Sequence, residues 1–581
     1  MQQLKKLLIL FILPLFLTVS CMDATQSSDS STGEKSECPV PGKTGVLKSI
    51  SAASAEENYS FSYNELVYIQ SPGTGEPATL TANVMIPVKK TEEETFPAIV
   101  FPNSWAMDEH EYIMQAQKFA KKGYIVLGYS CRGWYLSTGK VSLGGRDEVA
   151  DFQAVLDWLI ANTPVDKDNI GACGISYGAI QSLNALCHDT RLKTVAVLSI
   201  PSDVARHLYS EQTPRLVWGG FLVATGTVLA RMDPILYKVY ESTLTNTNIE
   251  WLMDWVYERS PINYVDNINL KNNPVYMSHN FEDYLFTADS VISLFNELTV
   301  DHKRLDLNLG THATGELTGL MGLDNYAFNN VHKWFDYWLR GVDTGIITEQ
   351  SKSAVVTMQE KNNGNRVTYD TASLEKSDGS YTWPAKTINE KLFYLTPRGL
   401  FTNGAINSSF NTRNTSNNYW SGFLSGATAG AAIIPILEQF GVELCTNVHL
   451  LNRAESIAWE SSSFSSAMKI RGASEAKLNI SFSGSKGQII AYLYDVDKWG
   501  KAVFITHGAY TFWDVVPGKA FEVTVPILAT AYDIPAGHHL ALVVDSSDIM
   551  YGKPTLMPYT TKVYYSSSSE KQNAVIIPFE K

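Results

Sequence analysis

Residues 169–185 read NIGACGISYGAIQSLNA, an apolar run that passes through G-x-S-x-G into a segment of helix-forming residues. This order is typical of a nucleophile elbow, a strand-to-helix turn so sharp that it lifts a serine hydroxyl above the edge of a sheet. Gly174 and Gly178 flank the turn, where side chains would not fit. Because the pattern also occurs by chance at ordinary glycine turns, its meaning depends on the surrounding sequence. We predict that Ser176 is the nucleophile of a serine hydrolase.

The segments on both sides alternate between short apolar runs and amphipathic stretches. Such alternation predicts buried parallel strands separated by helices that cover both faces of the sheet. An antiparallel hairpin between residues 63 and 87 is expected to lead into this sheet. The predicted strands are 97–101, 124–128, 169–173, 194–198, 275–278 and 305–309, and the predicted helices are 111–121, 147–160, 179–185 and 329–339. Together with the elbow they predict the α/β class and an α/β-hydrolase domain at residues 61–347.

Two regions depart from this alternation. Aromatic-rich helical segments without buried strands fill residues 203–267, where an α/β-hydrolase carries a lid over its active site. After residue 348 the helical periodicity nearly vanishes, and short alternating strands follow at 391–395, 477–481, 488–493 and 540–544. Residues 348–581 are therefore predicted to form a C-terminal all-β sandwich, a jelly roll. A small apolar patch at 426–436 fits either an inserted loop or a short helix.

The first residues are predicted to be a targeting signal rather than part of the fold. Lys5 and Lys6 precede an apolar run at 7–17, which is too short to span a membrane and fits a signal peptide. The run ends in LTVSC, which resembles the lipobox of bacterial lipoproteins except that Thr18 stands where leucine is preferred. We expect residues 1–21 to be a lipoprotein-type signal peptide, Cys21 to be lipidated, and 22–60 to be a polar tether. A simple secretory signal is the alternative.

Length and charge narrow the class of function. A chain of 581 residues is too long for one core and should hold two or three domains. Its formal net charge of −13, with no basic run, argues against nucleic acid as a partner. Instead, the predicted partners are a small-molecule ester, amide or short-peptide substrate and a membrane, the latter through the lipid on Cys21.

The serine needs a base within hydrogen-bond reach and an acid that orients the base. In an α/β-hydrolase these follow the serine in the order acid, then histidine, each on a loop after a strand. The segment HNFED at 279–283 follows one predicted strand, and GTH at 310–312 follows the next. We assign Asp283 as the acid and His312 as the base, with Glu282 as the alternative acid. The predicted reaction passes through an acyl-enzyme and requires no metal or organic cofactor.

Further motifs carry a resemblance to a known family. Besides the elbow GISYG, the chain has RGWYLSTG at 132–139, EVAD at 148–151, HKWFDYWLRG at 332–341, WP at 383–384, FYL at 393–395 and YDV at 494–496. From about Tyr63 to its C-terminus the chain resembles the Xaa-Pro dipeptidyl-peptidase/cocaine esterase (CocE/NonD) family of α/β-hydrolases. That resemblance implies the same Ser176, Asp283 and His312 triad and the same C-terminal jelly roll.

The resemblance also implies an oxyanion hole. One donor would be the main-chain N–H of Tyr177, and the other a tyrosine hydroxyl after the 97–101 strand. Here Trp105 stands at that place, and its indole N–H is a donor of different reach. The alternatives are that Trp105 lines the acyl pocket and that the second donor is a main-chain N–H or Ser104. Trp134 and Trp218 are the candidate substrate-binding residues, although each equally fits a core position.

Three functions follow from these residues. The first is an exported serine hydrolase that cleaves esters or amides of small acyl substrates. The second is an Xaa-Pro dipeptidyl-peptidase, which would need a carboxylate to hold the free amine of its substrate. The third is a surface lipoprotein whose jelly roll binds glycan or protein, with a vestigial hydrolase domain. A bacterial lipoprotein, periplasmic or at the cell surface, is expected in each case.

Overall fold

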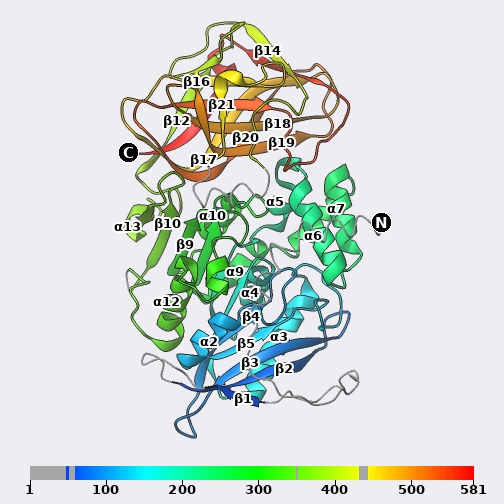
Figure 1. Cartoon of the computed structure of the whole chain (residues 1–581), viewed down its shortest axis with the longest axis vertical. Helices are drawn as coiled ribbons and strands as arrows, with labels where there is room; N and C mark the ends of the chain where they lie inside the picture. The colour runs from blue at the N-terminus through cyan, green and yellow to red at the C-terminus, as the bar shows by residue number, and fades with distance from the viewer. Residues whose placement is uncertain (1–46, 51–58, 349–350, 431–442) are drawn as a thin grey trace, which may run out of the picture.

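The computed structural model describes residues 47–50, 59–348, 351–430 and 443–581, with backbone alone at 47–50. The predicted signal peptide, Cys21, most of the tether and much of the 426–436 patch lie outside these residues. Figure 1 shows an α/β body below and a β body above, joined through a group of helices. Among the residues that the structure describes, no helix is long and apolar enough to cross a membrane.

The lower body is built on a sheet of eleven strands. Its middle strands, from β5 to β10, run parallel, and the entry strands β1, β2 and β3 pair antiparallel. In spatial order the strands are β1 (Leu47–Ile50), β2 (Phe61–Ser71), β3 (Ala78–Pro87), β5 (Ile125–Tyr129), β4 (Phe96–Pro102), β6 (Val165–Ile175), β7 (Leu192–Leu198), β8 (Val275–Asn280), β9 (His302–Asn308), β10 (Ser353–Gln359) and β11 (Arg366–Tyr369). This sheet confirms the predicted α/β-hydrolase fold.

Helices cover both faces of this sheet. Alternate residues of β4 belong to different core clusters, with Val100 on the face of one and Ile99 on the face of the other. The helices are α2 (Ile113–Lys121), α3 (Arg146–Asn162), α4 (Tyr177–His188), α10 (Ala288–Glu297), α11 (Leu317–Leu320) and α12 (Tyr326–Arg340). The α12 helix begins where the Asn325 side chain accepts from the Phe328 N–H, and it ends at Gly341, whose positive φ suits glycine. Apolar strands between covered faces explain why the sequence indicated a parallel sheet.

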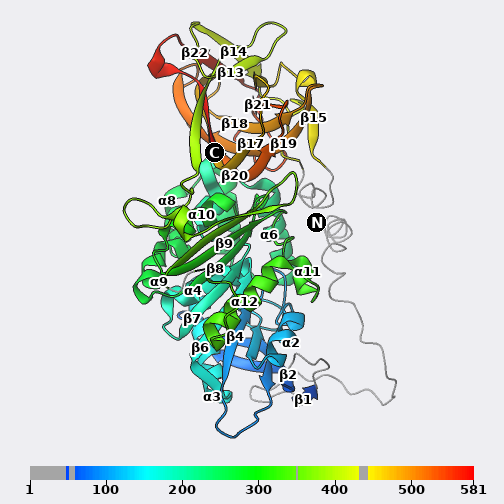
Figure 2. The ribbon, with the colours of Figure 1, turned by 90° about the vertical axis from the view of Figure 1, so that its left-hand side faces the viewer.

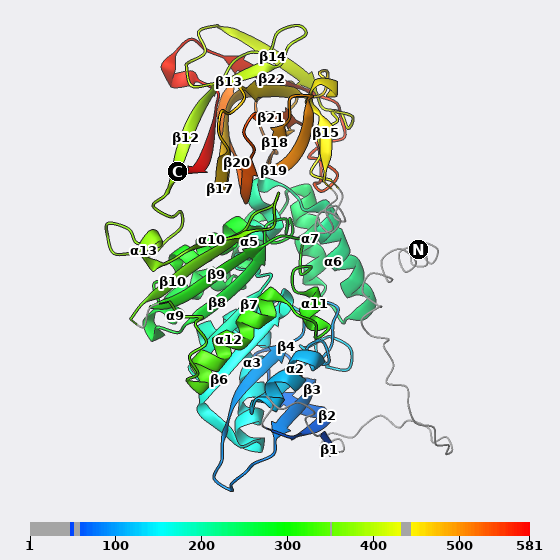
Figure 3. The same cartoon turned by 60° about the vertical axis from the view of Figure 1, so that its left-hand side comes forward.

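Between β7 and β8 the chain forms the helical insertion, here called the lid. It contains α5 (Val204–Tyr209), η1 (Ser210–Gln212), α6 (Leu216–Leu229), α7 (Ile235–Thr245), α8 (Ile249–Tyr257), η2 (Pro261–Tyr264) and α9 (Val265–Lys271). Figure 3 shows α6 and α7 beside the sheet and directly beneath the upper body. The lid therefore lies in contact with both bodies, as the hydrogen bond from Trp513 Nε1 to the Gln212 carbonyl illustrates.

The upper body is a β domain, in agreement with the predicted jelly roll. All its strand pairs except β13 with β16 are antiparallel. Its strands are β12 (Ile388–Leu395), β13 (Gly404–Asn407), β14 (Thr415–Trp420), β15 (Cys445–Asn447), β16 (Ile457–Ser461), β17 (Met468–Phe482), β18 (Gly487–Val496), β19 (Lys501–Phe512), β20 (Phe521–Ile534), β21 (His539–Asp545), β22 (Thr560–Tyr565) and β23 (Ala574–Glu580). Figure 2 shows these strands curving over the end of the lower body.

The first strands after residue 348 differ from the prediction. We expected residues 348–581 to lie in the β-sandwich, but β10 and β11 extend the lower sheet, with β10 parallel to β9. Almost every residue of β10 is buried, as in a strand covered on both faces. The short α13 (Thr371–Leu374) then leads toward the β domain. Short apolar strands of parallel and antiparallel sheets look alike in sequence, which is why β10 and β11 were expected in the sandwich.

Candidate active site

The elbow lies where β6 passes into α4. Ser176 has φ 56° and ψ −117°, a backbone conformation that side chains rarely adopt. A Cβ on Gly174 would lie 2.3 Å from the main chain of Gly178, and one on Gly178 would lie 2.4 Å from the Pro102 carbonyl oxygen. Both glycines are thus required by the close approach of backbone to backbone, and the strained turn points the Ser176 hydroxyl out of the sheet edge.

Three side chains, each from the end of a different parallel strand, meet at this edge of the sheet. Asp283 follows β8, His312 follows β9, and Ser176 follows β6. His312 Nε2 lies 2.7 Å from Ser176 Oγ, and His312 Nδ1 lies 2.7 Å from Asp283 Oδ2. Because parallel strands end at the same edge of a sheet, residues far apart in the chain are brought within hydrogen-bond distance here.

Main-chain hydrogen bonds hold the carboxylate of Asp283 in position beside the imidazole of His312. The side chain has no exposed surface, and its Oδ1 accepts from the N–H groups of Leu285, at 3.0 Å, and Phe286, at 2.9 Å. Its Oδ2 accepts from His312 Nδ1–H, which leaves Nε2 unprotonated and able to accept from the serine hydroxyl. The arrangement therefore sets the tautomer of His312 as well as its orientation.

The neighbouring Glu282 faces elsewhere. Its Oε2 accepts from the Gly310 N–H at 2.8 Å, and its Oε1 lies 3.7 Å from Lys361 Nζ. His279, four residues before Asp283, is held by Ile200 and Phe286 instead. Burial lowers the pKa of His279, which keeps the imidazole neutral. Of the two acids weighed from the sequence, the one hydrogen-bonded to His312 is Asp283.

The segment after β4 approaches the elbow from the other side. The Ser104 hydroxyl donates to the Ile175 carbonyl at 2.9 Å, and the Ser104 N–H donates to Glu111 Oε2 at 2.6 Å. The hydroxyl and the N–H of Ser104 therefore both donate to protein acceptors. Tyr177 is the first residue of α4, where the helix itself offers the N–H no acceptor. Two main-chain segments thus flank the serine, with the positive end of a helix dipole on one side.

The indole N–H of Trp105 is not placed as an oxyanion donor, the role that we expected for it. Its Nε1 donates to the Leu222 carbonyl at 3.2 Å and to Thr225 Oγ1 at 3.1 Å, both in the lid helix α6. The indole N–H is thus directed into the lid, which contradicts the expectation that it faces an oxyanion. A lid helix folded over this position provides the acceptors, and no sequence pattern predicts a contact between segments so far apart. The Trp105 main-chain N–H, by contrast, has no acceptor among the described residues.

The two tryptophans predicted to contact substrate have different surroundings. Trp134 has no exposed surface, and its ring packs 4.8 Å from Trp105 and 6.3 Å from Tyr177. This core position contradicts a substrate-binding role for Trp134. Trp218, from α6, lies with its ring 5.9 Å from that of His312, and its buried indole N–H has no hydrogen-bond partner. Trp218 is therefore the one that reaches the site.

Two family models match this chain. Residues 75–314 match the X-Pro dipeptidyl-peptidase (S15 family) model, and residues 348–577 match the X-Pro dipeptidyl-peptidase C-terminal non-catalytic domain. A putative Xaa-Pro dipeptidyl-peptidase of Streptomyces avermitilis is 20% identical over 489 residues, covering 74% of this chain and 68% of the relative.

Two solved structures share the fold. One is a CocE/NonD family hydrolase from Staphylococcus aureus, with TM-score 0.68 and 13% identity over 92% of this chain and 97% of that one. The other is an alpha-amino acid ester hydrolase, with TM-score 0.66 and 14% identity over 92% and 98%. The chain belongs to the X-Pro dipeptidyl-peptidase/CocE family of α/β-hydrolases. It is accordingly a serine hydrolase, an esterase or a peptidase.

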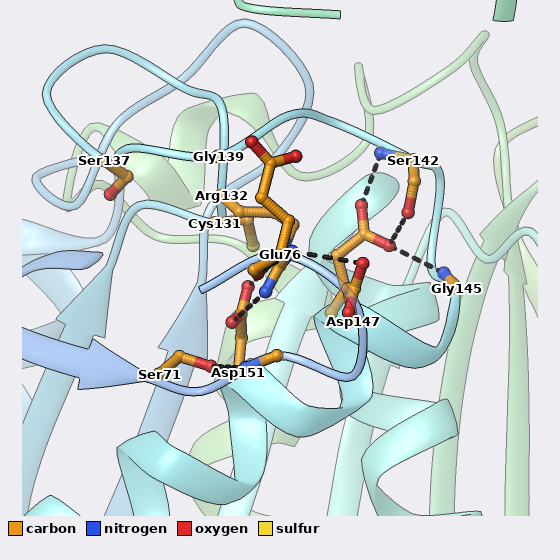
Figure 4. A network of polar contacts seen from close by, with 12 residues as sticks. Ser71, Glu76, Cys131, Arg132, Ser137, Gly139, Ser142, Gly145, Asp147 and Asp151 are labelled. Carbon is orange, nitrogen blue, oxygen red and sulfur yellow. Dashed lines mark hydrogen bonds and ion pairs between the residues drawn. The ribbon is translucent and has the colours of Figure 1, made fainter. Parts of the chain in front are cut away.

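The segment RGWYLSTG at 132–139 contains one partner of a buried ion pair. Figure 4 shows the Arg132 guanidinium on Asp151, to which Nε and Nη2 each donate at 2.7 Å. Arg132 Nη1 also donates to the Glu76 carbonyl at 3.0 Å. Both charged side chains are almost fully buried, and the permanent charge of Arg132 favours the ionised form of Asp151. The pair joins the loop after β5 to α3.

Glu148 anchors the elbow helix. Its carboxylate accepts from the N–H groups of Ser142 and Gly145, both at 2.7 Å, and from the Tyr177 hydroxyl at 2.9 Å. Burial raises the pKa of Glu148, while these donors favour its ionised form. The side chain of Tyr177 is therefore tied to the start of α3, which fixes the direction of the Tyr177 N–H beside Ser176.

A network behind His312 was missed from the sequence. Glu316 is fully buried and accepts from Ser199 Oγ at 3.1 Å and Asn280 Nδ2 at 3.0 Å, while Ser199 Oγ accepts from the Ala313 N–H at 3.1 Å. These bonds hold the loop that carries His312. The only hint in the chain is that Asn280 and Glu316 stand within four residues of Asp283 and His312, and no motif distinguishes them.

The described residues include one group of possible metal ligands. The ligand atoms of Asp108, Glu109 and His110 lie within 4.8 Å of one another. Glu109 Oε2 already accepts from the hydroxyls of Thr81 and Ser130, and Asp108 accepts from the His110 N–H. The carboxylates are thus occupied by protein donors, and we assign this group no metal.

Proposed function

We propose that Ser176, His312 and Asp283 are the catalytic triad of a hydrolase that acts on esters or amides of small acyl substrates. The single observation that carries this proposal is the hydrogen-bonded chain from Ser176 Oγ through His312 to Asp283, with both links at 2.7 Å. The burial of Asp283 and its two main-chain donors support the same roles, because an orienting carboxylate must hold one position.

The reaction would proceed by acyl transfer. Ser176 Oγ attacks the carbonyl carbon of the substrate while His312 Nε2 takes the hydroxyl proton. The imidazolium, stabilised by Asp283, then gives this proton to the leaving group as the bond to the acyl carbon breaks. Water, deprotonated by His312, attacks the acyl-enzyme, and the serine recovers its proton.

The developing oxyanion needs donors near Ser176. We assign one to the main-chain N–H of Tyr177, the first residue of α4, where the helix dipole also favours negative charge. For the second we replace the Trp105 indole with the Trp105 main-chain N–H. Its neighbour Ser104 touches the Ile175 carbonyl, which brings this segment beside the nucleophile. Trp218, against the His312 ring, is the assigned substrate contact.

An Xaa-Pro dipeptidyl-peptidase is the second candidate, because the chain matches the model for that family and relatives bear that name. The two candidates separate in a simple assay. A dipeptidyl-peptidase would release nitroaniline from Gly-Pro-p-nitroanilide much faster than it hydrolyses p-nitrophenyl butyrate, whereas an esterase would show the opposite order. A binding protein with a vestigial site would turn over neither.

The test of the triad uses the Ser176→Ala variant. Turnover of p-nitrophenyl butyrate and labelling by a fluorophosphonate probe should both disappear, because neither the acyl-enzyme nor the phosphonylated serine can form. Far-ultraviolet circular dichroism and the unfolding midpoint should stay close to those of the wild type. Ser182→Ala, in the same helix α4, is the matched control and should retain labelling. Activity retained in Ser176→Ala would contradict the assignment.

We also propose export and lipidation at Cys21, on the sequence alone. In a bacterial host the full chain should incorporate labelled palmitate and sediment with membranes, and Cys21→Ser should do neither. A Cys21→Ser chain that still carries palmitate would contradict this proposal.

A further inference from the structure

An apolar pocket lies inside the lid, next to the triad. Its walls include Trp105, Leu143, Leu222, Met232, Leu236 and Val239, and they come from the end of β4, the loop before α3, and lid helices α6 and α7. Trp105 follows β4, which is hydrogen-bonded to β6, the strand that carries Ser176. Gly219, another wall residue, directly follows Trp218, whose ring lies 5.9 Å from that of His312, so α6 connects the pocket to the triad.

One charged side chain lines this apolar pocket. Arg215, immediately before α6, is 7% exposed and stands one helical turn from Trp218, whose ring contacts that of His312. Its Nη1 donates to the Tyr551 hydroxyl at 3.1 Å, but its Nε is buried without a hydrogen-bond partner. No carboxylate in the described part of the chain lies within 4.0 Å of the guanidinium nitrogens.

The groups around Arg215 do not neutralise it. Asp289 is occupied by the Ala529 N–H, 3.3 and 3.1 Å from its two oxygens. Burial raises the pKa of Glu211, and the charge of Arg215 opposes this shift, but the two side chains form no ion pair. The Tyr551 hydroxyl donates onward to His507 Nε2 at 2.6 Å, and burial lowers the pKa of His507 to about 3, so this imidazole is neutral.

A guanidinium stays charged at any physiological pH, and burying it without a counter-ion is costly. An apolar wall with a single cation at one point is the arrangement expected for binding an amphiphilic anion. The wall contacts a hydrocarbon chain, and the planar guanidinium donates two hydrogen bonds to a carboxylate. A free amine, which a dipeptidyl-peptidase must hold, would be repelled at the same point.

We propose that Arg215 is a specificity-determining residue that binds a free carboxylate on the substrate, several carbons away from the carbonyl that Ser176 attacks. This inference rests on the proposed hydrolase function and narrows its substrates to esters or amides bearing a terminal carboxylate. The guanidinium of Arg215 donates hydrogen bonds to this carboxylate, and the apolar chain of the substrate lies along the lid pocket.

The test compares p-nitrophenyl esters matched in length. The monoesters of glutaric and adipic acid carry the carboxylate on the acyl side, and pentanoate and hexanoate esters are their neutral counterparts. A third pair, the aryl acetates 4-acetoxybenzoate and phenyl acetate, places the carboxylate on the leaving group. We expect kcat/KM to favour the anionic member of at least one pair by about 10- to 100-fold. Absence of that preference in all three pairs would overturn the proposal.

Variants identify the residue responsible. Arg215→Met keeps an extended apolar side chain and should lower kcat/KM for the anionic ester at least tenfold more than for its neutral counterpart. Arg215→Lys should retain only part of the preference, because an ammonium lacks the planar fork. Arg206→Met changes an exposed arginine of the same lid and should leave the preference intact. If Arg215→Met lowers both members of a pair equally, Arg215 has a structural role and the proposal is wrong.

A binding measurement keeps this proposal separate from the triad. Monomethyl adipate should bind the Ser176→Ala variant, which cannot turn it over, and titration calorimetry should show at least tenfold weaker binding when Arg215→Met is added. Equal binding by both proteins would overturn the carboxylate site. Failure of fluorophosphonate labelling in the wild type would instead refute the proposed function, and the calorimetric result would still decide the role of Arg215.

Discussion

Asp283 and Glu282 are neighbours with the same functional group, yet packing gives them different partners. Asp283 points to His312 and receives two main-chain N–H groups, whereas Glu282 lies against Lys361 and the Gly310 N–H. The sequence predicts an acid on this loop because the loop follows a strand. It left two acids open because one residue along the chain reverses the direction in which a side chain points.

This difference predicts unequal effects of two similar substitutions. Asp283→Asn should lower kcat for a p-nitrophenyl ester by about 10³- to 10⁴-fold, because an amide cannot stabilise the imidazolium and favours the wrong tautomer. Glu282→Gln, the matched control, should stay within about threefold of wild type, since its remaining carbonyl oxygen still accepts from Gly310. Steady-state kinetics on both variants provides the measurement. The reverse order of effects would mean that Glu282 is the orienting acid.

The loop between β4 and α2 is held in place by Glu111. This residue is almost fully buried, and its two oxygens contact the N–H and the hydroxyl of Ser104, each at 2.6 Å. Burial raises the pKa of Glu111 to about 8, so the carboxyl is protonated in the folded protein at neutral pH. A protonated Glu111 can donate to Ser104 Oγ, which leaves the serine proton for the Ile175 carbonyl. One ionisable group thus holds the segment that flanks the elbow.

The raised pKa has a consequence for stability. The folded state binds this proton more tightly than the unfolded chain, whose pKa is about 4.5, so the free energy of unfolding decreases as the pH rises from about 4.5 to 8 and levels off above. Glu111→Gln, which mimics the protonated form, lacks this loss. Its stability relative to wild type should increase by up to about 1.4 kcal/mol per pH unit across that window.

Urea unfolding at a series of pH values from 5 to 9 measures this difference. Glu93→Gln, an exposed substitution between β3 and β4, is the control and should show no such trend. A difference between Glu111→Gln and wild type that stays constant with pH would contradict a protonated Glu111.

The two bodies of the molecule are joined by buried charges as well as by the lid. Arg471, in β17 of the β domain, has no exposed surface and contacts Glu360, which follows β10 of the lower sheet. The same guanidinium lies 2.7 Å from Asp533 and 3.7 Å from Glu580. Around it, Lys361 N–H donates to the Ala531 carbonyl and Thr213 meets Thr511. The β domain therefore contacts both the lower sheet and the lid.

Removing this cation should destabilise the whole molecule. Arg471→Met leaves Glu360 buried without its partner, and we expect a loss of about 3–5 kcal/mol in the free energy of unfolding. Chemical unfolding followed by tryptophan fluorescence measures the loss, and Lys477→Met, at an exposed position of the same strand paired with Thr524 and Ala574, should change it by less than about 0.5 kcal/mol. Equal effects of the two substitutions would show that the Arg471 cluster contributes nothing to the junction.

Much of this fold could be predicted from the sequence because the patterns that indicate it are local. The elbow, the alternation of strands and helices, and the order of serine, acid and histidine depend on residues close in sequence, so the fold and the strand ends that carry Ser176, Asp283 and His312 follow from it. The helical insertion was visible for the same reason.

Other features arise only when distant segments pack. The Trp105 indole meets acceptors on α6 more than a hundred residues away, Trp134 is sealed in the core, and β10 joins the lower sheet by pairing with β9. The unpaired Nε of Arg215 likewise results from the lid folding against the β domain. Hydrogen-bond partners and burial depend on which surfaces meet in space, and a linear pattern records the residue but not the surface that it meets.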